Sequence, residues 1–295
     1  MESTSIFKTL EKLGLTSKES RVLYSERTRD IENLKVWKDS KSGVIYIDDF
    51  YSGEATYVDG VYRDELEILL KTGKQDFEKN SDAQRRFASN LKFVAGKKIA
   101  DFGCGSGEFL KLAQPYCSYA VGLELQQNYV DELNANGVLC TNDLKTIKDK
   151  SLDRIVSFHV IEHLPNPIET LAELRNKVVS GGQILIEVPH ANDFLLSTVN
   201  CDLFKQFTLW SQHLILHTRE SLFKTLDFAG FEEIQIQGIQ RYPISNHLNW
   251  LASGKPGGHK SQLSSLDSDA LHDAYQNSLA RINATDTLVA TALVP

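Results

Sequence analysis

One stretch decides the fold: Lys97-Lys-Ile-Ala-Asp-Phe-Gly-Cys-Gly-Ser-Gly107. Its apolar residues predict a buried strand, and the three glycines at alternate positions leave a backbone that a ligand can approach closely. Residues 108–113, which follow, have the pattern of a helix. A glycine-rich turn between a strand and a helix N-terminus is a common binding place for nucleotide-like ligands.

The spacing of these glycines argues against a dinucleotide-binding loop. Such a loop has the pattern G-x-G-x-x-G, which seats a pyrophosphate at the helix N-terminus. The pattern here is D-x-G-x-G-x-G, and its first residue is Asp101. A carboxylate repels a pyrophosphate but attracts an ammonium group, so the loop predicts a cofactor that carries an amino-acid part.

Acidic residues also follow the next predicted strands. Glu124 ends a predicted strand over residues 118–124, where a carboxylate can accept hydrogen bonds from both hydroxyls of a ribose. Asn142 and Asp143 follow a short apolar run. Beyond them, residues 152–163 and 181–189 predict two further buried strands. Strands that alternate with helices predict a parallel sheet.

Five such motifs in this order over residues 97–189 resemble those of the class I methyltransferases that depend on S-adenosylmethionine (SAM). The resemblance implies an α/β, Rossmann-like fold with a mostly parallel sheet flanked by helices. It also implies SAM as cofactor and S-adenosylhomocysteine as product, with the loop against the methionine part and Glu124 on the ribose. The implied cofactor-binding residues are Asp101, Gly103, Cys104, Gly105, Ser106, Gly107, Glu124, Asn142, Asp143 and His159.

Three parts are expected along the chain. Residues 1–74 predict an N-terminal helix and a small β module with a hairpin around Ser42-Gly43, and residues 75–239 the SAM-binding domain. Residues 240–295 predict a substrate loop followed by a helical extension. The place of the β module resembles the zinc-binding module of bacterial sugar C-methyltransferases, but the cysteine ligands are absent, so no metal is expected.

Composition suggests the partner class and the compartment. The formal net charge of −7 gives no broad attraction to phosphate backbones. It therefore predicts a small-molecule or sugar acceptor and no nucleic acid. The net charge does not exclude a local basic patch. No apolar run approaches the ~20 residues of a membrane span, and no signal peptide is evident, so a cytoplasmic protein without membrane insertion is expected.

Histidines are the candidate catalytic residues. Methyl transfer from a sulfonium is an in-line displacement that often requires a base to remove a proton from the acceptor. His163 and His213 are the predicted catalytic residues, since His163 lies in an E-H-L pattern that resembles a methyltransferase subgroup acting on small molecules and sugars. A purely structural role at the end of a strand is the alternative for His163.

The predicted substrate-binding residues lie further along the chain. Arginine, asparagine and histidine form directional hydrogen bonds to hydroxyls, carboxylates and phosphates. The alternative is a structural role: His217 would anchor the start of a helix, and the other predicted residues would only form hydrogen bonds within a surface loop. The residues are His217, Arg241, Asn246 and His259.

Together these features predict a SAM-dependent methyltransferase that acts on a nucleotide-linked sugar or a polysaccharide precursor, with O-methylation preferred. One alternative is a non-catalytic SAM-binding regulatory protein, and another is a sugar C-methyltransferase. A tRNA methyltransferase or a quinone-type methyltransferase is a further enzymatic alternative. The acidic net charge argues against the tRNA enzyme.

Overall fold

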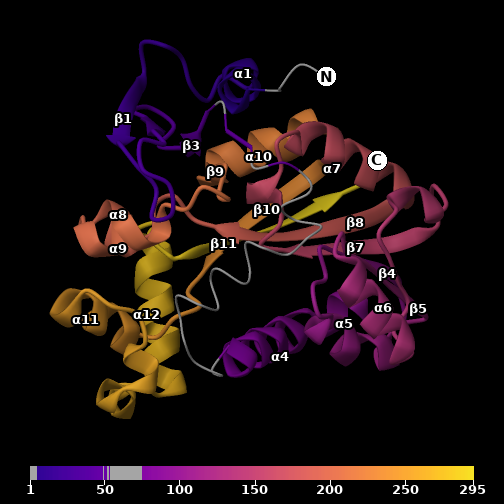
Figure 1. The fold of residues 1–295 in the computed structure, drawn as a ribbon. Helices are drawn as coiled ribbons and strands as arrows, with labels where there is room; N and C mark the ends of the chain where they lie inside the picture. Colours follow the sequence, from indigo (N-terminus) through magenta and orange to yellow (C-terminus); the bar gives the residue numbers. More distant parts are fainter. Residues whose placement is uncertain (1–4, 49, 52, 54–74) are drawn as a thin grey trace.

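The computed structural model describes residues 5–48, 50, 51, 53 and 75–295. Among these residues, the central element is a seven-stranded sheet with the strand order β10-β11-β8-β7-β4-β5-β6 (Figure 1). Strands β4 to β8 pair in parallel, whereas β11 is antiparallel to both of its neighbours. The strands are β4 (Lys98–Phe102), β5 (Tyr119–Leu123), β6 (Cys140–Thr141), β7 (Leu152–Phe158), β8 (Val178–Pro189), β10 (Glu232–Ile239) and β11 (Thr287–Leu293). The predicted α/β class with a mostly parallel sheet is confirmed.

Helices cover both faces of this sheet because its strands are apolar on both sides. Ile155 of β7 belongs to one buried cluster and the next residue, Val156, to the other, as the two-residue period of a strand requires. The first cluster packs under α7 (Pro167–Lys177) and α10 (Arg219–Phe228). The second packs under α4 (Gln75–Val94), α5 (Glu108–Ala113) and α6 (Gln127–Ala135).

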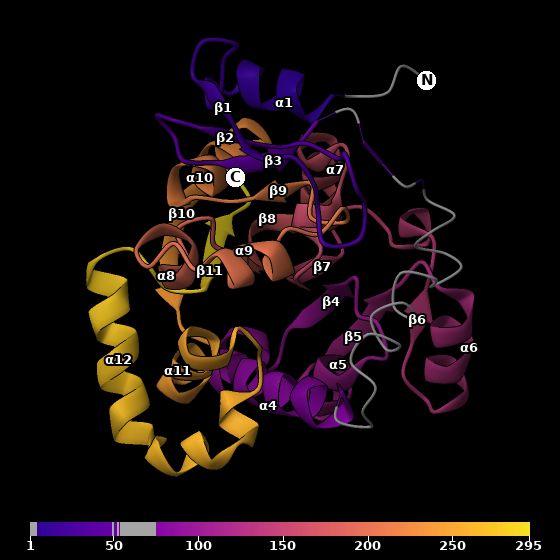
Figure 2. The same cartoon turned by 60° about the vertical axis from the view of Figure 1, so that its left-hand side comes forward.

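The N-terminal residues form a second sheet, as the hairpin signal predicts. Within the described residues its order is β1-β2-β3-β9, and all of its pairs are antiparallel. The elements are α1 (Ile6–Lys12), β1 (Arg21–Ser25), β2 (Val36–Asp39), β3 (Ile45–Ile47) and β9 (Ile215–Leu216). Because β9 belongs to the chain that follows β8, the module is joined to the central domain by backbone pairing (Figure 2).

Residues 190–212 contain two short helices, α8 (Phe194–Ser197) and α9 (Asp202–Thr208). After β10 follow α11 (Ile244–Ser253) and α12 (Asp269–Arg281). Short 3-10 turns complete the described elements: η1 (Gln114–Tyr116), η2 (Leu144–Thr146), η3 (Ile161–His163), η4 (Gly258–Lys260) and η5 (Gln262–Leu266). No helix of the described residues is long and apolar enough to cross a membrane.

Strand β11 is the main departure from the expected organisation. The sequence predicts only a loop and a helical extension over residues 240–295, yet residues 287–293 form a strand of the central sheet between β8 and β10. A short apolar run of this kind becomes a central strand only through pairing with distant residues, which no local pattern reports. The division at residues 74 and 239 stays a prediction, and residues 54–74 lie outside the described part of the chain.

Candidate active site

The glycine loop forms a tight cradle at the carboxyl end of β4. Gly103, Gly105 and Gly107 have φ values of 76°, 56° and 77°, a region that side chains disfavour. A Cβ added at Gly103 would lie 2.3 Å from a methyl of Val160, and one at Gly107 would lie 2.6 Å from a methyl of Leu133. The loop therefore tolerates only glycine at these two positions in this packing.

Glu124 holds the other side of the loop. Its carboxylate accepts hydrogen bonds from the backbone N–H of Gly105 at 2.8 Å and of Gln126 at 3.0 Å. The side-chain amide nitrogen of Gln126 is buried and has no hydrogen-bond partner within the described residues. A buried unpaired donor two residues after this carboxylate fits a polar ligand with hydroxyl groups, such as a ribose.

Asp101 is buried at the start of the loop. Burial, opposed by the charge of Arg86 and aided by Glu124 and Glu108, raises the pKa of its carboxyl to about 7. A ligand ammonium group beside this carboxyl would stabilise its ionised form. The orphaned amide of Gln126, the glycine cradle and Asp101 therefore fit the ribose and the amino-acid part of SAM.

The remaining predicted cofactor residues lie around the same strand ends. The sulfur of Cys104 is 3.8 Å from the sulfur of Cys140, and the hydroxyl of Ser106 donates to Glu108. Asn142 and Asp143 are exposed after β6, where Asp143 caps a short turn through the N–H of Lys145. Their roles toward the cofactor stay predictions.

A chain of polar contacts runs beside the cradle. His159 has a positive φ of 56°, and its Nε2 lies 3.0 Å from the guanidinium of Arg241. The same Nε2 lies 3.3 Å from a carboxylate oxygen of Glu187, and Nδ1 of His159 lies 3.2 Å from one of Glu162. Arg241 is also ion-paired with Asp82 of α4. The guanidinium of Arg241 is therefore fixed by a carboxylate on one side and an imidazole on the other.

Helix α4 contributes residues that the sequence does not single out. Arg85 and Arg86 both pair with Glu187 near the end of β8, at 3.0 and 2.7 Å. One signal is visible in the sequence, since Glu187 is a lone carboxylate in the apolar run 184–189. The pairing of Arg241 with Asp82 has no such signal, because the two residues are distant along the chain.

The two predicted catalytic histidines lie side by side. Their ring centroids are 5.1 Å apart, and the ring of Trp210 is 6.0 Å from that of His163 and 5.3 Å from that of His213. Nδ1 of His163 lies 2.7 Å from the carbonyl oxygen of Gln212. This nitrogen must donate, so a neutral His163 carries its lone pair on Nε2.

His213 and the neighbouring Glu162 both have lowered pKa values. Burial and the neighbouring His163 lower the pKa of His213 to about 3. Burial alone would raise the pKa of Glu162, but a hydrogen bond from His159 and the adjacent histidines lower it to about 2. One ligand atom each of Glu162, His163 and His213 lie within 4.8 Å of one another, a spacing that could hold a metal ion. The expected absence of a metal therefore stays a prediction.

The other predicted substrate-binding residues make contacts within the protein itself. His217 is fully buried, and its Nδ1 lies 3.1 Å from the hydroxyl of Ser221 in the first turn of α10. The side-chain oxygen of Asn246 accepts from the N–H of Gly257 at 2.9 Å. His259 packs against the ring of Tyr242. Their substrate roles stay predictions, as does that of Arg241.

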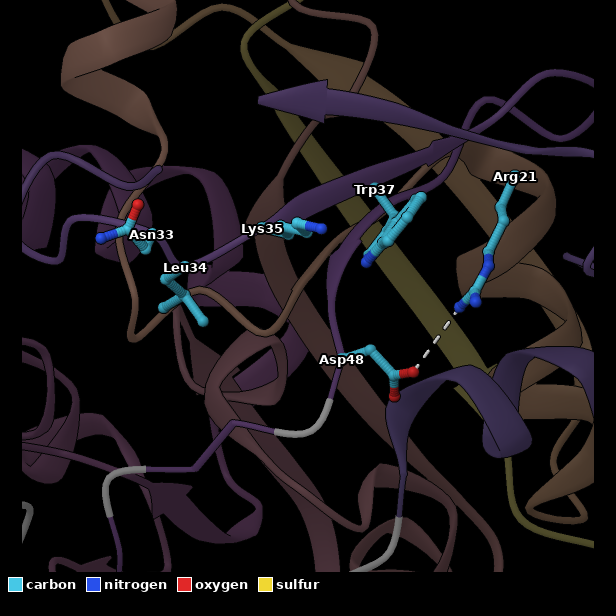
Figure 3. A pocket seen from close by; sticks show the side chains of 6 residues that line it. All are labelled: Arg21, Asn33, Leu34, Lys35, Trp37 and Asp48. Atoms are coloured by element: carbon cyan, nitrogen blue, oxygen red, sulfur yellow. Dashed lines mark ion pairs between the residues drawn. The ribbon is translucent and has the colours of Figure 1, made fainter. Parts of the chain in front are cut away.

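A cavity of about 300 Å³ lies in the N-terminal module, apart from all predicted site residues (Figure 3). In it, the guanidinium of Arg21 lies 4.5 Å from the centroid of the Trp37 ring and pairs with Asp48 at 3.7 Å. The lining residues are Arg21, Asn33, Leu34, Lys35, Trp37 and Asp48.

Residues 73–236, more than half of the chain, match a protein family described as "Methyltransferase domain". The chain belongs to this family. The match confirms the predicted SAM-dependent methyltransferase domain and SAM as its cofactor. A solved SAM-dependent methyltransferase from Archaeoglobus fulgidus has the same fold, with a TM-score of 0.51 and 18% identity over 79% of this chain and 99% of that one.

Curated relatives of this family member are similar over a shorter segment. A tRNA U34 carboxymethyltransferase of Edwardsiella ictaluri is 31% identical over 124 residues, which are 38% of this chain and 38% of that protein. The mouse tRNA (carboxymethyluridine(34)-5-O)-methyltransferase ALKBH8 is 32% identical over 100 residues, which are 32% of this chain and 15% of that protein. The chain thus matches well under half of the length of each.

These relatives contradict the predicted acceptor and partner of this methyltransferase-family chain. The expected small-molecule or sugar acceptor, the link to polysaccharide precursors and the exclusion of nucleic acid are wrong, because the relatives are named for tRNA. The error has a physical cause. Net charge describes the whole surface, whereas RNA binding depends on where a few cations lie. The cytoplasmic location stays a prediction.

Proposed function

We propose that the protein transfers the methyl group of SAM to a nucleoside of tRNA. The observation that carries this proposal is the similarity of more than 30% to relatives named for modification of tRNA uridine 34. It is supported by a cradle that fits SAM and by the adjacent rings of His163, which follows the neighbouring strand β7, and His213. SAM supplies a methyl group on a sulfonium, and the protein supplies alignment and, where the acceptor atom carries a proton, a base.

In this proposal the loop and its flanking acids bind the cofactor. Asp101 pairs with its ammonium group and Glu124 accepts from its ribose hydroxyls. His163 is the proposed base, because its Nδ1–H is committed to the carbonyl of Gln212 and its Nε2 keeps a lone pair. His213, whose pKa of about 3 makes it a weak base, orients the acceptor and excludes water. Arg241, fixed by Asp82 and His159, borders the same site.

Methyl transfer to bulk tRNA tests the proposal. Purified protein is incubated with SAM carrying an isotopically labelled methyl group and with tRNA from cells that lack this protein. The tRNA is then digested, and its nucleosides are separated by mass spectrometry. One uridine derivative is expected to gain the labelled methyl, with an equal amount of S-adenosylhomocysteine.

Two comparisons make this result specific. The Gly105→Val variant is the negative control, because its side chain enters the cofactor cradle at a backbone with positive φ. S-adenosylhomocysteine formed at the same rate with and without tRNA would overturn the proposal.

A further inference from the structure

Two lysines from distant parts of the chain meet over one tyrosine ring. The ammonium nitrogen of Lys205, in α9, lies 3.8 Å from the centroid of the Tyr24 ring, and that of Lys38, in β2, lies 5.3 Å from it. Tyr24 lies at a β-bulge, where the register of β1 against β2 shifts between Leu23 and Ser25. A bulge redirects the side chain of its extra residue. The ring of Tyr24 thereby packs against the apolar cluster between the N-terminal sheet and α9.

Ion pairs are absent from this lysine pair in the described part of the chain. Within the described residues, neither Lys38 nor Lys205 has a carboxylate at ion-pair distance. Burial lowers the pKa of both lysines, and the charge of Lys205 lowers that of Lys38 further. The charge of Asp202 raises the pKa of Lys205 and so opposes the effect of burial, but Asp202 does not form an ion pair with Lys205. Two half-buried like charges are unfavourable unless an anion joins them, so the pair is suited to bind one.

The cavity of the same module provides a contrast. There the guanidinium of Arg21 also lies over an aromatic ring, that of Trp37, but it pairs with Asp48. The charge of Arg21 is thus balanced by a carboxylate of the same module, whereas Lys38 and Lys205 have no such carboxylate at ion-pair distance within the described residues. Strand β2 carries Trp37 and Lys38 on opposite faces, so the two groups lie on different sides of the sheet.

Further cations and rings continue from α9 toward the histidine pair. The guanidinium of Arg29 lies 5.4 Å from the centroid of the Phe207 ring and 4.4 Å from that of Trp210. Arg29 likewise has no ion pair within the described chain, and its guanidinium donates to the carbonyl of Phe207. Trp210 in turn contacts the rings of His163 and His213. Arg29 and its two rings thus lie between α9 and the candidate active site.

We propose that Lys38, Tyr24 and Lys205 form a binding site for the phosphodiester backbone of single-stranded RNA, and that Arg29 and Trp210 continue it toward His163. Cations bind phosphates, and aromatic rings stack on unpaired bases, which only loops and single strands present. The inference rests on the proposed function, since it identifies the surface that would hold the loop of a tRNA. This RNA site is local, in agreement with the acidic net charge of the chain.

The test measures RNA binding separately from methyl transfer. A fluorescent anticodon stem-loop is titrated with full-length protein in the presence of S-adenosylhomocysteine. The double variant Lys38→Gln/Lys205→Gln is expected to bind about 10- to 100-fold more weakly, since two phosphate contacts are lost. The charge-preserving variant Lys38→Arg/Lys205→Arg should retain binding. Lys12→Gln is the matched control, because Lys12 lies 4.6 Å from the Phe228 ring centroid, away from this site, and is exposed. It should bind as the wild type does.

Each other outcome is informative. Unchanged RNA affinity of the double glutamine variant, with its thermal unfolding intact, would overturn the inference. So would equal binding of a fully paired RNA duplex, or displacement of the stem-loop by polyglutamate at the same charge concentration. If the wild type methylates tRNA while the variants bind it equally well, only the RNA site is wrong. If the wild type methylates no tRNA, the proposed function is wrong, whatever the binding result.

Discussion

Burial of Asp101 couples cofactor binding to pH. In the free protein its pKa is raised to about 7 by burial, so below this pH the carboxyl is neutral. A cationic ammonium group binds the ionised form, and binding must therefore release a proton at low pH. We expect the dissociation constant of S-adenosylhomocysteine, measured by calorimetry, to rise about tenfold between pH 8 and pH 6. Asp101→Asn should bind weakly with little pH dependence, and an equal pH slope in this variant would contradict the role of Asp101.

The histidine pair should divide its roles unequally. His163→Ala is expected to lower kcat by about 10²–10⁴-fold, as the loss of a general base does, with unchanged SAM affinity. His213→Ala should lower kcat less. Because the pKa of His213 is already lowered to about 3, its ring stays neutral above pH 5, and this variant should keep the wild-type pH profile there. Steady-state rates over pH 5 to 9 provide the measurement, and full activity of both variants would exclude this site for the base.

At the scale of elements, one carboxylate ties the C-terminal strand to the connection after β10. Asp286, just before β11, accepts hydrogen bonds from the backbone N–H groups of Arg241 and Tyr242 and from the side chain of Gln240. Asp286→Ala leaves these donors without their acceptor, and we expect it to lower the free energy of unfolding by about 2–4 kcal/mol. Urea denaturation measures this loss. Asp273→Ala on the exposed face of α12 is the control, with an expected change within about 0.5 kcal/mol, and equal effects of the two would refute the link.

Pairing between elements also positions the candidate catalytic residues. Strand β9 begins two residues after His213 and pairs with β3 of the N-terminal sheet, so that module holds the segment that carries the histidine. On the other side, α4 pairs with β8 through Arg86 and Glu187 and reaches Arg241 through Asp82. Elements from the beginning, middle and end of the chain therefore converge on one edge of the sheet.

For the whole molecule, an acidic protein that binds RNA through a few cations should show a shallow salt dependence. Each phosphate neutralised in single-stranded RNA contributes about −0.7 to the slope of log K against log salt. With Lys38, Lys205 and Arg29 as the contacts, we expect a slope of about −2 for the anticodon stem-loop. Titrations at several KCl concentrations give this slope. A value steeper than about −5 would indicate a broad basic surface instead.

Local sequence determined the parts of this protein that depend on neighbouring residues. The glycine loop, Glu124 at the end of β5 and the alternating strands and helices of 97–239 follow from backbone freedom and hydrophobic period, which a few adjacent residues express. These features were sufficient for the fold, the domain family and the cofactor.

Only the tertiary structure decided what depends on residues far apart in the chain. It inserted β11 between β8 and β10, joined Arg241 to Asp82, and brought Lys38 and Lys205 to one ring. Composition misled about the acceptor for the same reason. A net charge of −7 sums every residue, whereas the energy of binding a phosphate depends on the distance and burial of the few cations beside it.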